Sequence, residues 1–246
     1  MKEIVSFGIK IHPLRKHDFL AIIDNGIKNK KQLIQSGINA ASVVELKHLP
    51  SLEVAYNNCD LINIDGMSMV WALRFFGFRI PERVACPDLA EGLMELAEKN
   101  GYGIYLFGAK EEILLSALQN IKSNYPRIKI SGYRNGYFSE DDEGSIVNMI
   151  NQSKADILFL GLPSPLKEMF VEKHKHSINS YYILGVGGFF DILSGSITRA
   201  PLWMQNTGFE WFYRFIQEPK RLLIRYLIGN IKFIWLVISE KTHFKK

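Results

Sequence analysis

The feature that most constrains the fold is an alternation of short apolar runs with longer amphipathic stretches. Apolar runs with the composition of buried strands cover residues 60–65, 102–108, 155–161 and 180–185, and a weaker run covers residues 128–133. Stretches of helical length cover residues 67–76, 88–100, 110–124, 140–153 and 165–176. Strands that alternate with helices are typical of βαβ units. We therefore predict an α/β fold with a Rossmann-like parallel sheet flanked by helices.

The first sixty residues carry weaker patterns, in which residues 19–27 and 38–46 could form helices. A chain of 246 residues can hold one large α/β domain with an appendage. Because the composition changes near Arg199, we predict a domain over residues 1–198 and a C-terminal appendage over residues 199–246.

Several predicted strands end in glycine-rich or polar segments. In open α/β sheets ligands bind at the carboxyl ends of the strands, where backbone N–H groups favour anions and glycine permits close approach. This geometry suits a nucleotide diphosphate, although each segment alone also fits a simple turn. The glycines expected to line a substrate site are Gly108, Gly161, Gly187 and Gly188.

The excess positive charge is confined to the appendage. From residue 199 onward, nine Lys or Arg stand against three Asp or Glu, whereas the preceding residues carry 21 against 22. Such asymmetry indicates a polyanionic partner, either nucleic acid or an anionic membrane surface. The appendage is also rich in aromatic and aliphatic side chains, which favours a membrane surface and argues against nucleic acid.

The appendage is expected to form two helices. Pro219 should interrupt a helix near Glu218, and residues 220–239 should form a second one. Arg225 and Lys232 interrupt its apolar run, so an interfacial helix fits better than a membrane span. The alternatives are a core helix with a solvated basic stripe, and packing against a second copy in a homo-oligomer.

Residues 1–10 lack the uninterrupted apolar core of a secretory signal, and Cys59 and Cys86 form neither a CxxC pair nor a metal cluster. We therefore expect two reduced thiols and a cytoplasmic protein attached peripherally to a membrane.

A series of short motifs runs along most of the chain. The earlier ones are Asn63-Ile-Asp65-Gly66, Arg83-Val-Ala-Cys-Pro-Asp88-Leu89, Leu106-Phe-Gly-Ala and Gly132-Tyr-Arg-Asn-Gly136-Tyr137-Phe138. The later ones are Ala155-Asp-Ile-Leu-Phe-Leu-Gly161, Gly185-Val-Gly-Gly-Phe-Phe-Asp191, Arg199-Ala-Pro201-Leu-Trp203, Gly208-Phe-Glu210-Trp211-Phe-Tyr213-Arg214 and Glu218-Pro219-Lys-Arg221. In this order they resemble the WecG/TagA/CpsF glycosyltransferases over roughly residues 37–226.

The resemblance implies an inverting, metal-independent transferase without a cofactor. It would take a sugar from a UDP-sugar, often UDP-N-acetylmannosamine or its uronic acid. The acceptor would be the 4-hydroxyl of a sugar on undecaprenyl diphosphate, at the inner face of the bacterial plasma membrane. Members of this family build linkage units of wall teichoic acid, enterobacterial common antigen, capsule or exopolysaccharide.

The resemblance also assigns roles to two catalytic residues. Asp65 matches the proposed general base, a carboxylate that takes the proton of the attacking hydroxyl, although Asp65-Gly66 alone reads as a turn. Arg83 matches a pocket arginine whose cation could neutralise the leaving diphosphate. Its alternative is a surface ion pair with Glu82 or Asp88.

Further matches concern substrate binding. Tyr137 and Asp191 match positions near the uridine, the carboxylate accepting hydrogen bonds from the ribose or the base. Arg214, Arg221 and Arg225 fit tail arginines that reach the acceptor's diphosphate, with binding of lipid headgroups as a compatible alternative.

Two positions depart from the family pattern. The Thr-x-Asn-Pro-Glu motif appears as Gly37-Ile-Asn39-Ala-Ala41, which keeps Asn39 in the pocket and loses the threonine hydroxyl. A usual Lys-Gln-Glu run reads Leu166-Lys167-Glu168, so that the Lys167 cation could meet a carboxylate on the sugar or part of the leaving diphosphate. The reaction class stands, and the sugar pair is left open.

Two other functions remain open. A Rossmann-type oxidoreductase would use residues 185–188, but Phe190 stands where the last glycine of GxGxxG belongs. The second is a non-catalytic membrane adaptor with the same fold, which the missing threonine makes conceivable.

Overall fold

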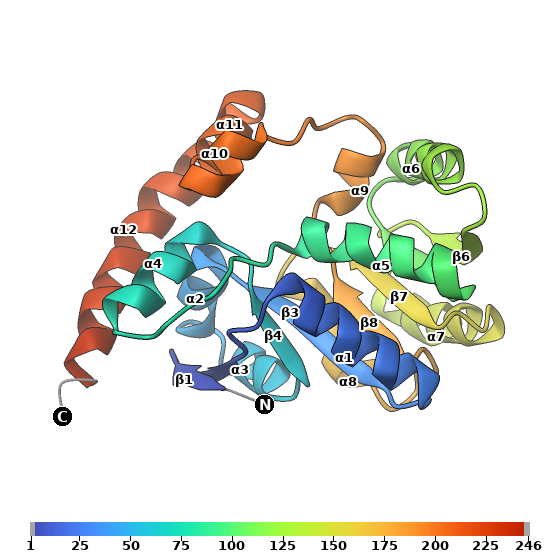
Figure 1. The fold of residues 1–246 in the computed structure, drawn as a ribbon, viewed down its shortest axis with the longest axis horizontal. Helices are drawn as coiled ribbons and strands as arrows, with labels where there is room; N and C mark the ends of the chain where they lie inside the picture. Colours follow the sequence, from blue (N-terminus) through green and yellow to red (C-terminus); the bar gives the residue numbers. More distant parts are fainter. Residues whose placement is uncertain (1–2, 244–246) are drawn as a thin grey trace.

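The computed structural model describes residues 3–243, apart from the side chains at positions 221, 222, 224–227 and 243. Its strands in the central sheet are β3 (Leu33–Ile38), β4 (Leu61–Ile64), β5 (Gly103–Gly108), β6 (Lys129–Arg134), β7 (Ile157–Gly161) and β8 (Tyr182–Gly185). They form one six-stranded parallel sheet in the order β4-β3-β8-β7-β5-β6 (Figure 1). The predicted α/β fold with a parallel sheet is confirmed.

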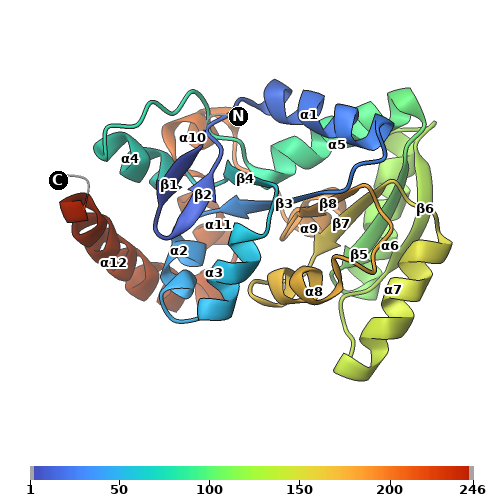
Figure 2. The same ribbon diagram turned by 90° about the horizontal axis from the view of Figure 1, so that it is seen from below.

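Helices cover both faces of this sheet. One layer contains α1 (Lys16–Lys28), α5 (Cys86–Asn100), α6 (Glu111–Asn124) and α9 (Phe189–Leu193), and the other contains α7 (Glu143–Gln152) and α8 (Leu166–His174). Figure 2 shows α1 and α5 on one side of the strands and α7 and α8 on the other. Ile104 and Leu106 pack into the first layer, whereas Tyr105 and Phe107 pack into the second. Burial on both faces explains why the strands read as uninterrupted apolar runs.

The N-terminal residues differ from the sequence-based expectation. A hairpin of β1 (Ile4–Ser6) and β2 (Ile9–Ile11) turns at Phe7-Gly8, whose φ angles of 55° and 83° suit a tight two-residue turn. The helix expected over residues 38–46 begins later, as α2 (Ala40–Leu46), because Ile38 ends β3. The helices α3 (Pro50–Asn57) and α4 (Met67–Phe75) complete this part of the fold.

The chain ends in three further helices. These helices, α10 (Leu202–Thr207), α11 (Glu210–Gln217) and α12 (Pro219–His243), form the tail. Earlier in the chain, a 3-10 turn, η1 (Glu140–Asp142), precedes α7. The interruption expected near Glu218 is confirmed, since α11 ends at Gln217 and α12 begins at Pro219. Within the described residues, no helix combines the length and the hydropathy that a membrane span requires.

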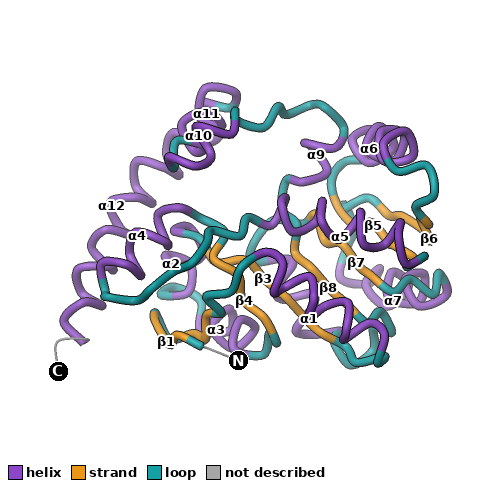
Figure 3. Tube along the Cα trace, viewed as in Figure 1, coloured by secondary structure: helices purple, strands orange, loops and turns teal. Residues whose placement is uncertain are grey.

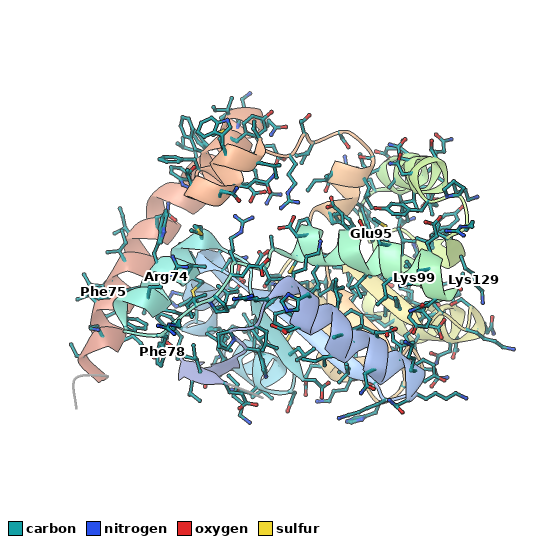
Figure 4. The ribbon with its side chains drawn as sticks, in the orientation of Figure 1. Arg74, Phe75, Phe78, Glu95, Lys99 and Lys129 are labelled. Atoms are coloured by element: carbon teal, nitrogen blue, oxygen red, sulfur yellow. The ribbon has the colours of Figure 1, made fainter. Side chains whose placement is uncertain are left out.

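The second half of α12 packs onto the rest of the molecule. Phe233 is buried, and its ring centroid lies 6.3 Å from that of Phe7. Glu240 Oε1 accepts a hydrogen bond from the Phe7 N–H at 2.6 Å, and Lys241 Nζ donates to the Phe75 carbonyl at 2.6 Å. Phe75 lies at the end of α4 beside α12 (Figure 4). Part of the tail therefore belongs to the hydrophobic core.

His12 ties the hairpin to β4. Its Nδ1 accepts a hydrogen bond from the Ile62 N–H at 3.0 Å, and its own backbone N–H donates to the Ile62 carbonyl at 2.9 Å. The side chain is 3% exposed, and this burial lowers the pKa of His12 below 6.5 despite the opposing charge of Glu3. The neutral imidazole is therefore the form that the fold prefers.

We expect the free energy of unfolding to decrease as the pH falls below 6.5, because the unfolded chain then binds a proton that folded His12 resists. Each unit of pKa difference is worth about 1.4 kcal/mol. Urea unfolding at about pH 7.5 and about pH 5.5 measures the change. In His12→Asn, whose amide oxygen can accept from Ile62, the decrease should be smaller. Equal decreases in both proteins would contradict the assignment.

Candidate active site

The candidate site lies at the carboxyl edge of the central sheet. All strands of a parallel sheet end at the same edge, so the segments after β3, β4, β5, β7 and β8 meet there. Asn39 follows β3, Asp65 follows β4, and Gly187 follows β8. Figure 3 shows the loop between α9 and α10 crossing from this region to the tail helices.

Asp65 is held by two neighbouring elements. Its Oδ1 accepts a hydrogen bond of 2.7 Å from the backbone N–H of Cys86, the first residue of α5. Its Oδ2 lies 3.5 Å from Asn39 Nδ2, while Asn39 Oδ1 accepts from the Ala41 N–H at 3.0 Å and caps α2. The carboxylate is half-buried and held mainly through Oδ1; Oδ2, which receives one long hydrogen bond, keeps capacity to accept a proton.

The missing threonine has a structural counterpart. A Cβ at Gly37 would lie 2.4 Å from Cys86 Sγ and 3.1 Å from Asp65 Cβ, so the thiol occupies the space that a larger residue 37 would need. Burial and the nearby Asp65 carboxylate raise the pKa of the Cys86 thiol well above its ordinary value. Cys86 is therefore a neutral thiol that packs against the base candidate.

Arg83 pairs with the tail rather than with its sequence neighbours. Its Nη2 donates to Glu210 Oε2 at 2.7 Å, with both side chains largely buried. Glu210 Oε1 also accepts from Arg199 Nε at 3.3 Å, and Arg199 Nη1 pairs with Asp88. Burial opposes the charge of Arg199, but Asp88 and Glu210 raise its pKa above the ordinary arginine value. This chain of four charges joins α11 to the start of α5.

Arg214 reaches the glycine turn after β8. Its Nη2 lies 3.2 Å from the position that a Cβ on Gly188 would occupy, and Asp191 Oδ2 lies 3.5 Å from the same point. Gly187 has a φ of 55°, and a Cβ there would meet no atom within 4 Å. A guanidinium from the tail, a carboxylate and an open glycine backbone thus meet at one turn, which suits recognition of an anionic group and a hydroxyl.

Gly108 and Gly161 serve close packing. A Cβ on Gly108 would lie 2.4 Å from the Gly161 carbonyl, and a Cβ on Gly161 would lie 2.5 Å from the Phe190 ring. The space that these glycines leave is therefore filled by protein atoms.

Tyr137 stands on a loop that folds back over the sheet edge. The Gly136 N–H donates to the Ala109 carbonyl at 2.8 Å, and a Cβ on Gly136 would touch Leu162 at 2.9 Å. Tyr137 itself is 65% exposed. Strands β4 and β6 occupy opposite edges of the sheet, about 24 Å apart at the usual strand spacing. Tyr137 and Asp65 therefore lie in opposite halves of the site.

Lys167 is paired within the protein. It forms a short ion pair with Glu168, which also accepts a hydrogen bond from the Tyr56 hydroxyl at 3.3 Å. The stem of Lys167 lies over Gly185, where a Cβ would come within 2.7 Å of Lys167 Cε. The Lys167 charge is therefore balanced by a neighbouring carboxylate.

Two of the tail arginines cannot be placed in the site. Arg221 and Arg225 are in α12, but their side chains lie outside the described residues. Among the side chains that are described, no group of three His, Cys, Asp or Glu gathers as a metal site.

Sequence reasoning missed Glu210, Arg199 and Cys86 as members of this site. A signal for Glu210 was present, since it is one of three acidic residues in a strongly basic tail. Cys86 gave no signal, because its role comes from the backbone N–H and from the space beside Gly37.

Comparison with known proteins places the chain in a family. Residues 4–246 match the model of the glycosyl transferase WecG/TagA/CpsF family. A Bacillus subtilis (strain 168) protein named N-acetylglucosaminyldiphosphoundecaprenol N-acetyl-beta-D-mannosaminyltransferase is 33% identical over 181 residues, 74% of this chain and 69% of that protein. A protein of the same name from Bacillus spizizenii (strain ATCC 23059 / NRRL B-14472 / W23) is 28% identical over 200 residues, 79% and 76% of the two chains. The chain belongs to the WecG/TagA/CpsF family of glycosyltransferases.

Proposed function

We propose that the protein transfers a sugar from a UDP-sugar to a sugar on undecaprenyl diphosphate, in the synthesis of a bacterial surface polysaccharide. The observation that carries the proposal is Asp65, a half-buried carboxylate at the carboxyl end of β4, fixed through Oδ1 with Oδ2 able to accept a proton. The names of the two relatives point to an N-acetylmannosaminyl donor and an N-acetylglucosaminyl acceptor. The departures at Gly37 and Lys167 concern the sugar, and leave this pair as the first to be tested.

The reaction requires a base and a cation. The acceptor hydroxyl gives its proton to Asp65 Oδ2 as its oxygen bonds to the anomeric carbon, and the bond from that carbon to the UDP oxygen breaks with inversion. The leaving diphosphate gains negative charge, which a guanidinium stabilises. Arg83 and Arg214 are the candidates, because both lie at the carboxyl edge of the sheet. Arg83 keeps further N–H donors beside the one that binds Glu210.

The tail is the proposed contact with the inner face of the plasma membrane. Large apolar side chains are exposed along α12, at Ile228, Ile231, Ile234, Trp235 and Ile238. Their spacing of three and four residues places most of them on one side of the helix. Further exposed apolar side chains on α10 and α11 are Leu202, Trp203, Trp211, Phe212 and Ile216. An apolar face on a basic segment is typical of helices that lie in the membrane interface.

Asp65→Asn should lower kcat by about 100- to 10,000-fold, because the amide cannot take the proton. Its side-chain oxygen can still accept from Cys86, so the fold should be retained. Asp60→Asn is the matched control and should keep kcat. Asp60 lies at the opposite end of β4, where its Oδ2 accepts a hydrogen bond from the Ile34 N–H at 2.9 Å. Undiminished transfer by Asp65→Asn would remove Asp65 as the base.

A donor screen tests the substrates. UDP-sugars are incubated with N-acetylglucosaminyl-diphosphoprenol, and we expect a product heavier by one N-acetylhexosamine from UDP-N-acetylmannosamine, detected by mass spectrometry.

EDTA should leave the rate of sugar transfer unchanged, because stabilisation of the leaving diphosphate is assigned to arginine cations. Complete inhibition that Mg²⁺ or Mn²⁺ reverses would refute a metal-independent mechanism.

Ile231→Glu combined with Trp235→Glu should weaken binding to vesicles with anionic lipids by about tenfold or more, because burial of each side chain contributes roughly 1.5–3 kcal/mol. Sedimentation with vesicles measures the effect. Leu115→Glu replaces an apolar side chain on α6 that is 42% exposed, and should bind as the wild type does. These variants are preferable to deletion of residues 199–246, which would remove Phe233 from the core. Unchanged binding by the double variant would exclude α12 as the membrane contact.

A further inference from the structure

Three polar side chains are linked inside the central sheet. Asn63 on β4 and Gln35 on β3 are 0% and 1% exposed, and Tyr182 on β8 is equally buried. The Tyr182 hydroxyl donates to Gln35 Oε1 at 2.8 Å, and Gln35 Nε2 donates to Asn63 Oδ1 at 2.9 Å. Asn63 Nδ2 then donates to the Val84 carbonyl at 2.7 Å.

The direction of this chain is fixed by its last member. The Val84 carbonyl can only accept, so Asn63 must present its amide NH₂ group there and its oxygen to Gln35. Gln35 must then present its NH₂ group to Asn63 and its oxygen to Tyr182. One arrangement of donors and acceptors therefore satisfies all three side chains, and it fixes the orientation of the Asn63 amide.

The hydrogen-bonded chain ends at Val84, beside Arg83 and close to Asp65, the two catalytic candidates. Asn63 Nδ2 also lies 3.6 Å from Cys86 Sγ, and the Val84 N–H donates to the Ile64 carbonyl at 3.0 Å. The Cys86 N–H in turn holds Asp65. Residues 84–86 are thus fastened to Asn63 and to the two residues that follow it, with Arg83 immediately before them.

Buried amides of this kind are not needed for the stability of a sheet. An apolar residue avoids the cost of desolvating a polar group, so a polar chain across three strands requires another reason. A geometric reason exists, since the hydrogen-bonded chain connects the middle of the sheet to the loop before α5.

We propose that Asn63 is a positioning residue, which holds the 83–86 segment so that Asp65 and Arg83 face the same substrate. The proposal rests on the proposed function for the roles of Asp65 and Arg83. Asn63 touches neither substrate, and acts through the Val84 carbonyl and the Cys86 thiol. A displacement of about 1 Å at such a segment is enough to lower a rate about 100-fold.

The test uses Asn63→Asp in the full chain. When protonated, the new carboxyl can donate to Val84 and accept from Gln35, as the amide does; when ionised, it cannot donate. Burial shifts such ionisation upward, into the range of about pH 6 to 9. We expect kcat relative to wild type to fall roughly 10- to 100-fold as the pH rises through this range, with the donor KM little changed. A purely structural role would reduce the folded fraction, and leave kcat per folded molecule unchanged.

A further test uses two variants that each lack one tyrosine hydroxyl. Tyr182→Phe breaks the chain at its far end and should lower kcat about fivefold, the equivalent of one hydrogen bond. Tyr105→Phe is the control: Tyr105 is another buried tyrosine on a strand, it takes no part in the hydrogen-bonded chain, and loss of its hydroxyl should leave kcat unchanged.

Thiol labelling supplies a readout that needs no sugar. Asn63→Asp at high pH and Tyr182→Phe should label Cys86 faster relative to Cys59, the other cysteine of the chain, whereas Tyr105→Phe should not. If wild type transfers no sugar from any donor, the proposed function fails, and the labelling ratio still decides the positioning. Unchanged kcat and an unchanged labelling ratio in Asn63→Asp and Tyr182→Phe would overturn the proposal.

Discussion

The hydrogen bond from the Cys86 N–H to Asp65 joins the end of β4 to the first turn of α5. A helix begins with N–H groups that lack partners inside the helix, and here a carboxylate supplies one. The same bond brings the base candidate next to the segment that carries Arg83. Closeness of the two elements depends on Gly37, because any side chain there would displace the Cys86 sulfur. Local chain geometry and the proposed chemistry therefore rest on one junction.

The tail is attached to this junction as well as to the far side of the molecule. Glu210 lies between Arg83 and Arg199, so two cations at the sheet edge are balanced by one carboxylate from α11 and by Asp88. At its other end, α12 is fixed through Phe233 in the core. Because the tail is anchored at α11 and along the second half of α12, the exposed apolar side chains on these helices are held in a defined orientation relative to the site.

Most of the sheet could be predicted from sequence because its strands are buried on both faces and read as apolar runs. The exception is β3, whose sequence LIQSGI contains Gln35 and Ser36 and so lacks that signature, although every residue of it is buried. The position of Asp65 after a strand could be predicted, whereas its role as the base comes from the resemblance to the family and stays a prediction. The pairing of Arg83 with Glu210 could not be predicted, since 127 positions separate the residues and no local pattern encodes their contact.

The two departures from the family pattern are both answered by neighbouring residues. Beside Gly37 the Cys86 thiol fills the space that a side chain would need, and its elevated pKa keeps it uncharged. At Lys167 the added cation forms an ion pair with Glu168. Both changes alter the shape of the site and its hydrogen-bonding groups. Discrimination between donor sugars is therefore expected to depend on fit at this edge, while the cations available to a diphosphate stay the same.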